Sequence, residues 1–107
     1  MGPTYQLLRQ LKVLRIRHSK IPNIGRKTLW GLSGLEVLDL SHNSLQDITE
    51  PNFDSLHSLR ELYLNDNGIK SIVSAVFRHA LKLQILSLAN NKLEGKQLFF
   101  MNNDGAQ

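Results

Sequence analysis

The sequence predicts an α/β-type repeat solenoid, a stack of 24-residue units with parallel strands on an inner face and irregular or 3-10 segments on an outer face. The main observation is that the chain aligns with itself at a shift of 24 residues without any insertion. In three consecutive units the first, fourth, sixth, eleventh, fourteenth, nineteenth and twenty-second positions are always hydrophobic. Of the 20 leucines, 17 occupy such positions, and only 7% of the residues are aromatic, so the predicted core is aliphatic.

The beginning of each unit predicts a short strand. Apolar and polar residues alternate from Leu38 to Ser41, which places alternate side chains on opposite faces. Because the pattern recurs in register, we expect the strands to pair in parallel, about 4.8 Å apart, with a continuous apolar layer on one face. Ile48, Phe53 and Leu56 or their equivalents then close this layer from the outer side. The four copies of the strand segment are 11–16, 35–40, 59–64 and 83–88.

The ninth position of the unit predicts a ladder of hydrogen bonds. It is occupied by Ser19, Asn43, Asn67 and Asn91, where the chain turns out of each strand. An asparagine amide can donate and accept at once, here to backbone groups of its own turn and of the next unit. We therefore interpret Asn43, Asn67 and Asn91 as a structural ladder. Ser19 makes fewer hydrogen bonds and should tie the first complete unit less firmly to its neighbour.

These residues resemble the leucine-rich repeat family. The pattern Leu-x-x-Leu-x-Leu-x-x-Asn-x-Leu is complete in three units of four, and the resemblance covers about residues 5–93. The 24-residue length and the spacing Phe53-x-x-Leu56 are most similar to the extracellular repeats of Toll-like receptors, Slit and small leucine-rich proteoglycans. The resemblance implies a curved leucine-rich repeat stack with the sheet on its concave face. It also implies a role in protein recognition and a receptor-like, extracellular or cell-surface parent protein.

The repeat boundaries divide a single domain into segments. After Leu93 the pattern fades, because Lys96 occupies the fourteenth position. The apolar cluster at 98–101 is either the remnant of a truncated unit, which we favour, or a makeshift cap. Since polar caps are missing at both ends, we expect the chain to be a fragment of a longer protein. The segments are a partial preceding repeat (1–10), three repeats (11–34, 35–58 and 59–82), a partial last repeat or cap (83–101) and a polar tail (102–107).

The composition excludes several classes of protein. There is no cysteine, and therefore no disulfide framework, thiolate zinc site or thiol nucleophile. No segment approaches the run of about 18 apolar residues that a membrane span needs, and the first residues lack the apolar run of a signal peptide. The chain itself therefore specifies no compartment. Glycine-rich phosphate loops and paired-carboxylate motifs are also missing from the sequence, so we expect no enzymatic activity and no cofactor.

The histidines are the remaining candidates for metal binding. His18 and His42 share the eighth position of successive units, whereas His57 and His79 lie toward the outer side. No carboxylate or cysteine stands at a fixed spacing with them. We therefore interpret the histidines as solvated polar residues and not as metal ligands.

Candidate binding residues are those that face away from the predicted core. The fold does not require an aromatic residue at Tyr63 or an arginine at Arg17, and rigid aromatics beside aliphatic residues and arginines are typical of interaction surfaces. We therefore predict that the concave face binds a protein ligand or co-receptor. The predicted partner-binding residues are Val13, Arg15, Arg17, His18, Val37, Asp39, Ser41, His42, Glu61, Tyr63, Asn65, Asp66 and Ile85.

The charges are polarised along the chain. Residues 1–34 contain seven basic residues and no acidic one, whereas residues 35–107 contain six basic and nine acidic ones, for a net charge of +4. We expect Arg15 and Asp39 to pair across neighbouring strands. Arg17, His18 and Lys20 have no acid at the matching positions of the next unit, so we assign them to an external anion.

This polarity leaves two alternatives to protein binding. The basic N-terminal third would suit a polyanion, either a glycosaminoglycan or nucleic acid. Nucleic acid is disfavoured because the large rings of this region, Tyr5 and Trp30, lie on the outer half and do not interleave with the basic residues. The basic leading end of one copy would also suit the acidic later region of another, giving a head-to-tail homo-oligomer through uncapped ends.

Overall fold

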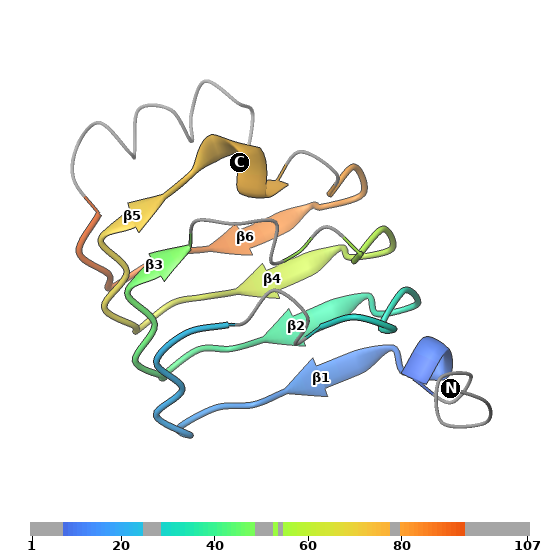
Figure 1. Cartoon of the computed structure of the whole chain (residues 1–107), viewed down its shortest axis with the longest axis horizontal. Coiled ribbons are helices and arrows are strands. Elements are labelled where there is room, and N and C mark those ends of the chain that lie inside the picture. The colour runs from blue at the N-terminus through green and yellow to red at the C-terminus, as the bar shows by residue number, and fades with distance from the viewer. Residues whose placement is uncertain (1–7, 25–28, 49–52, 54, 78–79, 94–107) are drawn as a thin grey trace.

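Four short parallel strands form the main sheet of the computed structural model, which describes residues 8–24, 29–48, 53, 55–77 and 80–93 (Figure 1). The strands lie in the order β1-β2-β4-β6, and each pairs with the next at a shift of 24 residues. Leu14 lies beside Leu38, Leu38 beside Leu62, and Leu62 beside Leu86. The predicted leucine-rich repeat solenoid is therefore confirmed. The strands are β1 (Val13–Arg15), β2 (Val37–Asp39), β4 (Glu61–Tyr63) and β6 (Ile85–Ser87).

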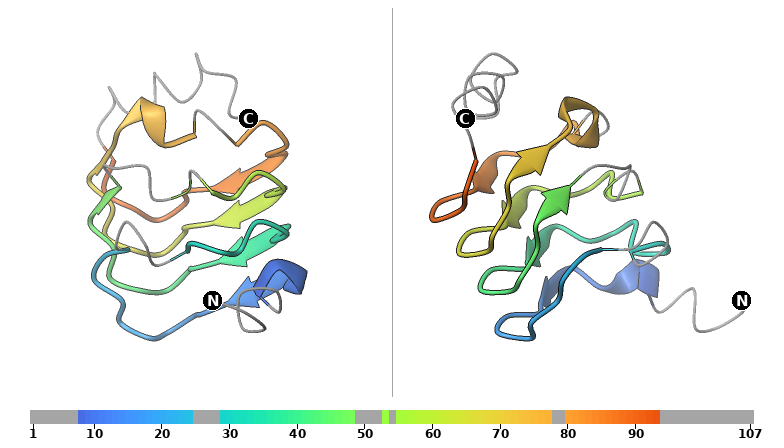
Figure 2. Two further views of the ribbon diagram at one scale, coloured as in Figure 1. Left: turned by 45° about the vertical axis from the view of Figure 1, so that its right-hand side comes forward. Right: turned by 60° about the vertical axis from the view of Figure 1, so that its left-hand side comes forward.

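A second, smaller sheet lies across the stack from the main one (Figure 2). It consists of β3 (Asp47–Ile48) and β5 (Ser71–Ile72), which pair in parallel. The hydroxyl of Ser71 donates a hydrogen bond to Oδ1 of Asp47 at 2.7 Å. A single 3-10 helix, η1 (Ser74–Phe77), follows β5 among the described residues. The outer segments thus include the expected 3-10 turn and a short sheet that the sequence analysis did not anticipate.

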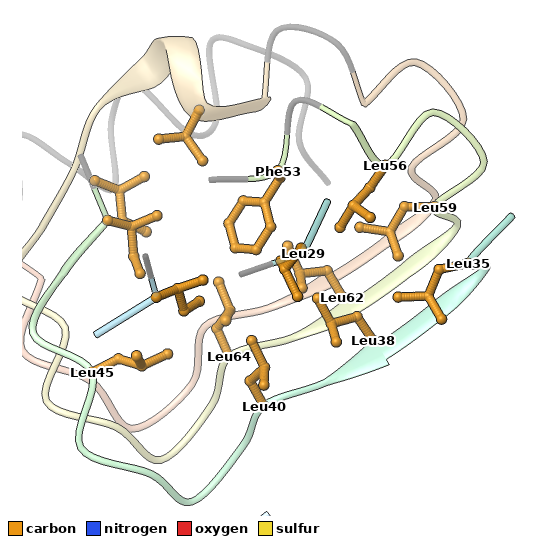
Figure 3. Packing of buried hydrophobic residues seen from close by; sticks show 14 of the residues in the cluster. Leu29, Leu35, Leu38, Leu40, Leu45, Phe53, Leu56, Leu59, Leu62 and Leu64 are labelled. Atoms are coloured by element: carbon orange, nitrogen blue, oxygen red, sulfur yellow. The ribbon is translucent and has the colours of Figure 1, made fainter. Parts of the chain in front are cut away.

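The core fills the space between the main sheet and the outer segments (Figure 3). Leu38 and Leu62 on the sheet are fully buried, and Phe53 closes the layer from the opposite side. The ring of Phe53 stacks with that of Phe77 in the next unit, with centroids 6.3 Å apart. The corresponding leucines of the first and fourth units, Leu14 and Leu86, are only partly buried. Burial is therefore greatest in the middle of the stack.

The asparagine ladder joins each unit to the one before it. The Nδ2 group of Asn43 donates to the carbonyl of Ile16 in the preceding unit at 2.8 Å and to that of Leu40 in its own unit at 3.0 Å. Its Oδ1 accepts hydrogen bonds from the N–H groups of Ser19 at 3.0 Å and Ile21 at 3.2 Å. The partner is thus the preceding unit, and the prediction that it is the next one is wrong. The first and second units are consequently tied by Asn43, whatever residue stands at position 19.

Asn67 and Asn91 repeat the same arrangement one and two units further on. Asn67 donates to the carbonyl of Leu40 at 3.1 Å, and Asn91 donates to that of Leu64 at 2.9 Å. The hydroxyl of Ser19, by contrast, donates to the carbonyl of Arg17 in its own turn, at 3.1 Å, and does not reach the preceding unit. The three asparagines therefore do structural work at every described junction.

The described residues before the first unit are in contact with it. Residues 8–10 are helical, and a Cβ atom added to Gly34 would collide with the carbonyl oxygen of Arg9. Only glycine fits this contact.

No helix in the described ranges is long and apolar enough to cross a membrane. The predicted cap or truncated unit at 98–101, the tail at 102–107, Tyr5, His79 and Lys96 lie outside the described residues.

Candidate functional site

The candidate site is the face of the main sheet that points away from the core. Its side chains come from the strand residues on either side of the buried leucines, and the pairing register aligns them into columns. No core position depends on them. One column contains Val13, Val37, Glu61 and Ile85, and the next contains Arg15, Asp39, Tyr63 and Ser87.

Two of the predicted binding residues on this face are covered. Asp39 is 6% exposed and Ser41 is 2% exposed. Arg15 and Arg17 reach across from the neighbouring strand and its extension, which explains this burial. Nη1 of Arg15 lies 3.3 Å from Oδ2 of Asp39, and Nε of Arg17 donates to the hydroxyl of Ser41 at 3.2 Å. The prediction that Asp39 and Ser41 are themselves exposed to a partner is therefore corrected, because the arginines occupy that position.

Arg17 also has an acidic partner, contrary to the prediction that only an external anion would pair with it. Its Nε lies 3.7 Å from Oδ2 of Asp39, on the diagonal between strands, so Arg15 and Arg17 share one carboxylate. Burial alone would raise the pKa of Asp39. Hydrogen bonds from the Ser41 hydroxyl at 2.6 Å and the Ser41 N–H at 3.0 Å, together with the arginines, lower the pKa by more than burial raises it. The net result is a pKa below the ordinary value, which keeps this carboxylate ionised.

The polar residues of the third unit bind mainly one another. The hydroxyl of Tyr63 donates to Oε1 of Glu61 at 2.8 Å, and this hydrogen bond raises the pKa of Tyr63. Nδ2 of Asn65 donates to Oδ2 of Asp66 at 2.7 Å, which lowers the pKa of Asp66. All four side chains are partly exposed. The third unit therefore presents an acidic, hydrogen-bonded surface beside the basic surface of the first.

The eighth positions form a column at the edge of the sheet. His18, His42, Asp66 and Asn90 all have positive φ values, between 57° and 59°. Asn, Asp and His are enriched in this conformation and β-branched residues are disfavoured, so the fold itself selects these residue types. The rings of His18 and His42 stack with centroids 4.6 Å apart, and Nε2 of His42 lies 3.6 Å from Oδ2 of Asp66. Among the described residues, no three potential metal ligands gather in one place.

Apolar side chains flank the charged residues on the concave face. Val13 at one edge of the sheet is 46% exposed, and Ile85 at the other edge is 43% exposed. Val37 lies between them in the same column and is partly buried. The face therefore combines aliphatic contact area with arginines and a tyrosine.

A shallow cavity, which the sequence analysis did not anticipate, lies beside the asparagine ladder. Its volume is about 300 Å³. Two of its lining residues are lysines, at the twelfth position of one unit and the tenth of the next, and no sequence pattern indicates a cavity there. The cavity is lined by Asn43, Ser44, Gln46, Asn67, Gly68, Lys70 and Lys92.

Solved structures share this architecture. The structure of a TLR13–ssRNA13 complex superimposes with a TM-score of 0.76 and 31% identity over 78% of this chain, and the match covers 12% of that chain. The LRR protein LIC12759 of Leptospira interrogans gives 0.72 and 26% over 87% of this chain, covering 23% of its own. The internalin inlF of Listeria monocytogenes gives 0.70 and 23% over 84%, covering 25% of its own, and supports the fold alone.

Sequence comparison leads to the same family. No match was found among curated proteins. One family model, described as Leucine rich repeat, matches residues 9–69, and a second, also described as Leucine Rich Repeat, matches residues 82–103. Domains of this kind are generally non-enzymatic scaffolds that mediate protein–protein interactions. Because the first match alone covers more than half of the sequence, the chain belongs to the leucine-rich repeat family.

Proposed function

We propose that the concave face of the main sheet binds a protein partner. One observation carries this proposal: the residues that face away from the core include exposed aliphatic side chains, a tyrosine and two arginines on one continuous sheet. These residue types are enriched where proteins meet. The core needs none of them, so their identities are free to serve recognition. The chain itself acts as a scaffold in this proposal and catalyses no reaction.

Both signs of charge on this face favour a protein partner. Arg15 and Arg17 belong to the first unit, whereas Glu61 and Asp66 belong to the third. A protein segment with mixed charges can complement both regions, with aliphatic contacts to Val37 between them. Electrostatic complementarity of this kind provides specificity and orientation.

Selection from a displayed library of random peptides tests the proposal. We expect peptides selected on the immobilised chain to lose binding to Val13→Lys, because the change places a charge within the apolar part of the face. Val73→Lys is the matched control: Val73 is 43% exposed, close to the 46% of Val13, but follows β5 in the other sheet. Selected peptides that lose binding equally to both variants, or to neither, would contradict a concave site. Light scattering on the same samples detects head-to-tail association.

A second candidate is a polyanion, supported by the exposed basic residues of the first unit and by the similarity to TLR13, whose structure contains ssRNA13. Lys12 and Lys20 add positive charge beside Arg15 and Arg17, and all four are exposed. We expect a heparin oligosaccharide and a single-stranded RNA to bind only weakly, since Glu61 and Asp66 oppose a polyanion that extends along the sheet. Affinity that exceeds that of the selected peptides and falls steeply with salt would favour this candidate.

We further propose that the parent protein is extracellular or exposed at the cell surface. The support is the 24-residue unit, which is similar to extracellular leucine-rich repeats. The chain spans 12% to 25% of the length of the structures it resembles, so the activity of a whole protein lies beyond this segment.

A further inference from the structure

Two arginines of the first unit are held on a single buried carboxylate. Asp39 is 6% exposed, and its Oδ2 lies 3.3 Å from Nη1 of Arg15 and 3.7 Å from Nε of Arg17. Its Oδ1 accepts the hydroxyl and the N–H of Ser41. Both oxygens are therefore engaged within the fold.

The two guanidinium groups remain accessible. The side chains of Arg15 and Arg17 are 53% and 48% exposed, although each is fixed at one end. One negative charge faces two positive ones, which leaves an excess positive charge on the concave face. A guanidinium has five N–H donors, and the described contacts of each arginine occupy few of them. The remaining donors match a planar carboxylate.

We infer that Arg15 and Arg17 form a preorganised site for an acidic side chain of a protein partner, with Asp39 as the positioning residue. This inference rests on the proposed function and names the chemistry of the partner: an Asp or Glu flanked by apolar residues. The neighbouring aliphatic side chains, Val13 and Val37, supply the apolar contact. Fixing the guanidinium groups before binding removes part of the entropy cost of ordering them.

The position of the site favours one carboxylate over a chain of anions. Arg15 pairs in register with Asp39, and Asp39 with Tyr63, whose hydroxyl binds Glu61. Strands are about 4.8 Å apart and β4 lies two strands from β1, so the strand of Glu61 is roughly 10 Å from that of Arg15, about one screening length at 0.1 M salt. A polyanion that continues across the sheet meets this acid, whereas a single acidic side chain does not.

A substitution at Asp39 distinguishes a preorganised site from one that attracts acids by its net charge alone. Asp39→Asn makes the face more positive, so a purely electrostatic site would bind an acid more tightly after this change. In a preorganised site the same change releases both arginines and weakens binding, by about tenfold. Asp47→Asn is the matched control, because it changes the net charge equally in the second sheet, where Asp47 is exposed and bonded to Ser71.

The experiment uses the full chain and two synthetic peptides, acetyl-Leu-Asp-Leu-amide and acetyl-Leu-Asn-Leu-amide. NMR titration follows the Nε–Hε signals of Arg15 and Arg17 in the parent chain and the backbone N–H signals of the main sheet in every variant. We expect the acidic peptide to shift both arginine signals and the amide peptide to bind at least about tenfold more weakly. In the double variant Arg15→Gln with Arg17→Gln, the two peptides should bind with the same affinity. Circular dichroism confirms that each variant is folded. If Asp39→Asn impairs folding, Ser41→Ala replaces it in the titration. This variant leaves the charge unchanged, and we expect it to lose part of the affinity for the acidic peptide.

The outcomes separate this inference from the proposed function. Equal binding of both peptides, or tighter binding of the acid by Asp39→Asn, would overturn the inference. If library peptides bind the concave face but contain no acidic residue and tolerate the arginine changes, the proposed function stands and the inference is wrong. If no library peptide binds that face, the proposed function is wrong, and the titration of the arginine signals still decides whether the pair accepts a carboxylate.

Discussion

The central units and the outer units of the stack contain nearly the same residues at the same positions but bury them differently. Leu38 and Leu62 are fully buried, whereas Leu14 and Leu86 are partly exposed, although all four occupy the fourth position of a unit. The difference arises because each leucine packs between the units on either side of it. Burial in this molecule is therefore a property of the neighbours and not of the sequence pattern alone.

The largest test of this comparison is a pair of alanine substitutions. Leu62→Ala should lower the free energy of unfolding by about 3 to 5 kcal/mol, because it removes a fully buried side chain and leaves a cavity. Leu86→Ala should cost about 1 to 2 kcal/mol, since this side chain is already partly hydrated. Urea unfolding followed by circular dichroism measures both. Equal losses would show that position in the stack has no influence.

A smaller contrast is expected along the asparagine ladder. Asn67→Ala should cost about 2 to 3 kcal/mol, because the N–H of Leu45 and the carbonyl of Leu40, both in buried residues, lose their partner. Ser19→Ala should change stability by less than about 0.5 kcal/mol, as the exposed hydroxyl bonds only within its own turn. The same urea experiment checks both variants. A cost for Ser19→Ala as large as that for Asn67→Ala would contradict the structural difference between the two positions.

The smallest effect concerns pH and the buried carboxylate of the second unit. Because the pKa of Asp39 in the folded chain lies below its ordinary value of about 4, the ionised form favours folding. Its contribution is complete above about pH 4 and disappears as the pH falls through the folded pKa. Asp39→Asn should therefore destabilise the chain by about 1 to 2 kcal/mol at neutral pH and by progressively less in acid.

Asp47→Asn provides the control for this pH dependence, since Asp47 is exposed. Thermal unfolding of both variants and the parent chain between pH 7 and about pH 3 gives the comparison. A stability difference for Asp39→Asn that stays constant over this range would show that ionisation of Asp39 contributes nothing.

The repeat period was sufficient to predict the main sheet, its register and the core. Pairing of Leu38 with Leu62 follows directly from a shift of 24 residues. The second sheet escaped prediction because β3 and β5 are only two residues long, too short for alternation to be recognised. The direction of the asparagine bonds also escaped it, since an amide at a turn can reach either neighbour and only the geometry of the stack decides.

The candidate site was predictable in outline but not in detail. Alternation correctly places Asp39 and Ser41 on the face opposite the core. Their burial depends on how far Arg15 and Arg17 extend across to the next unit, and a comparison of equal positions does not include the diagonal contact from Arg17 to Asp39. The burial of a short side chain on this face thus depends on the long side chains of the neighbouring unit. The positive φ of His18 and His42 is likewise set by the turn.

Each ladder asparagine bonds the preceding unit, so the bonds of a junction are supplied by the unit on its C-terminal side. Every described unit after the first contains the asparagine that bonds it to the unit before. Asn91, for example, donates to the carbonyl of Leu64 and accepts a hydrogen bond from the N–H of Ile69. Because the N-terminus is synthesised first, each asparagine meets the backbone groups of a unit that is already present. Excision of 24 residues between equivalent positions should likewise leave an intact junction, so such a protein can lengthen or shorten by whole units during evolution.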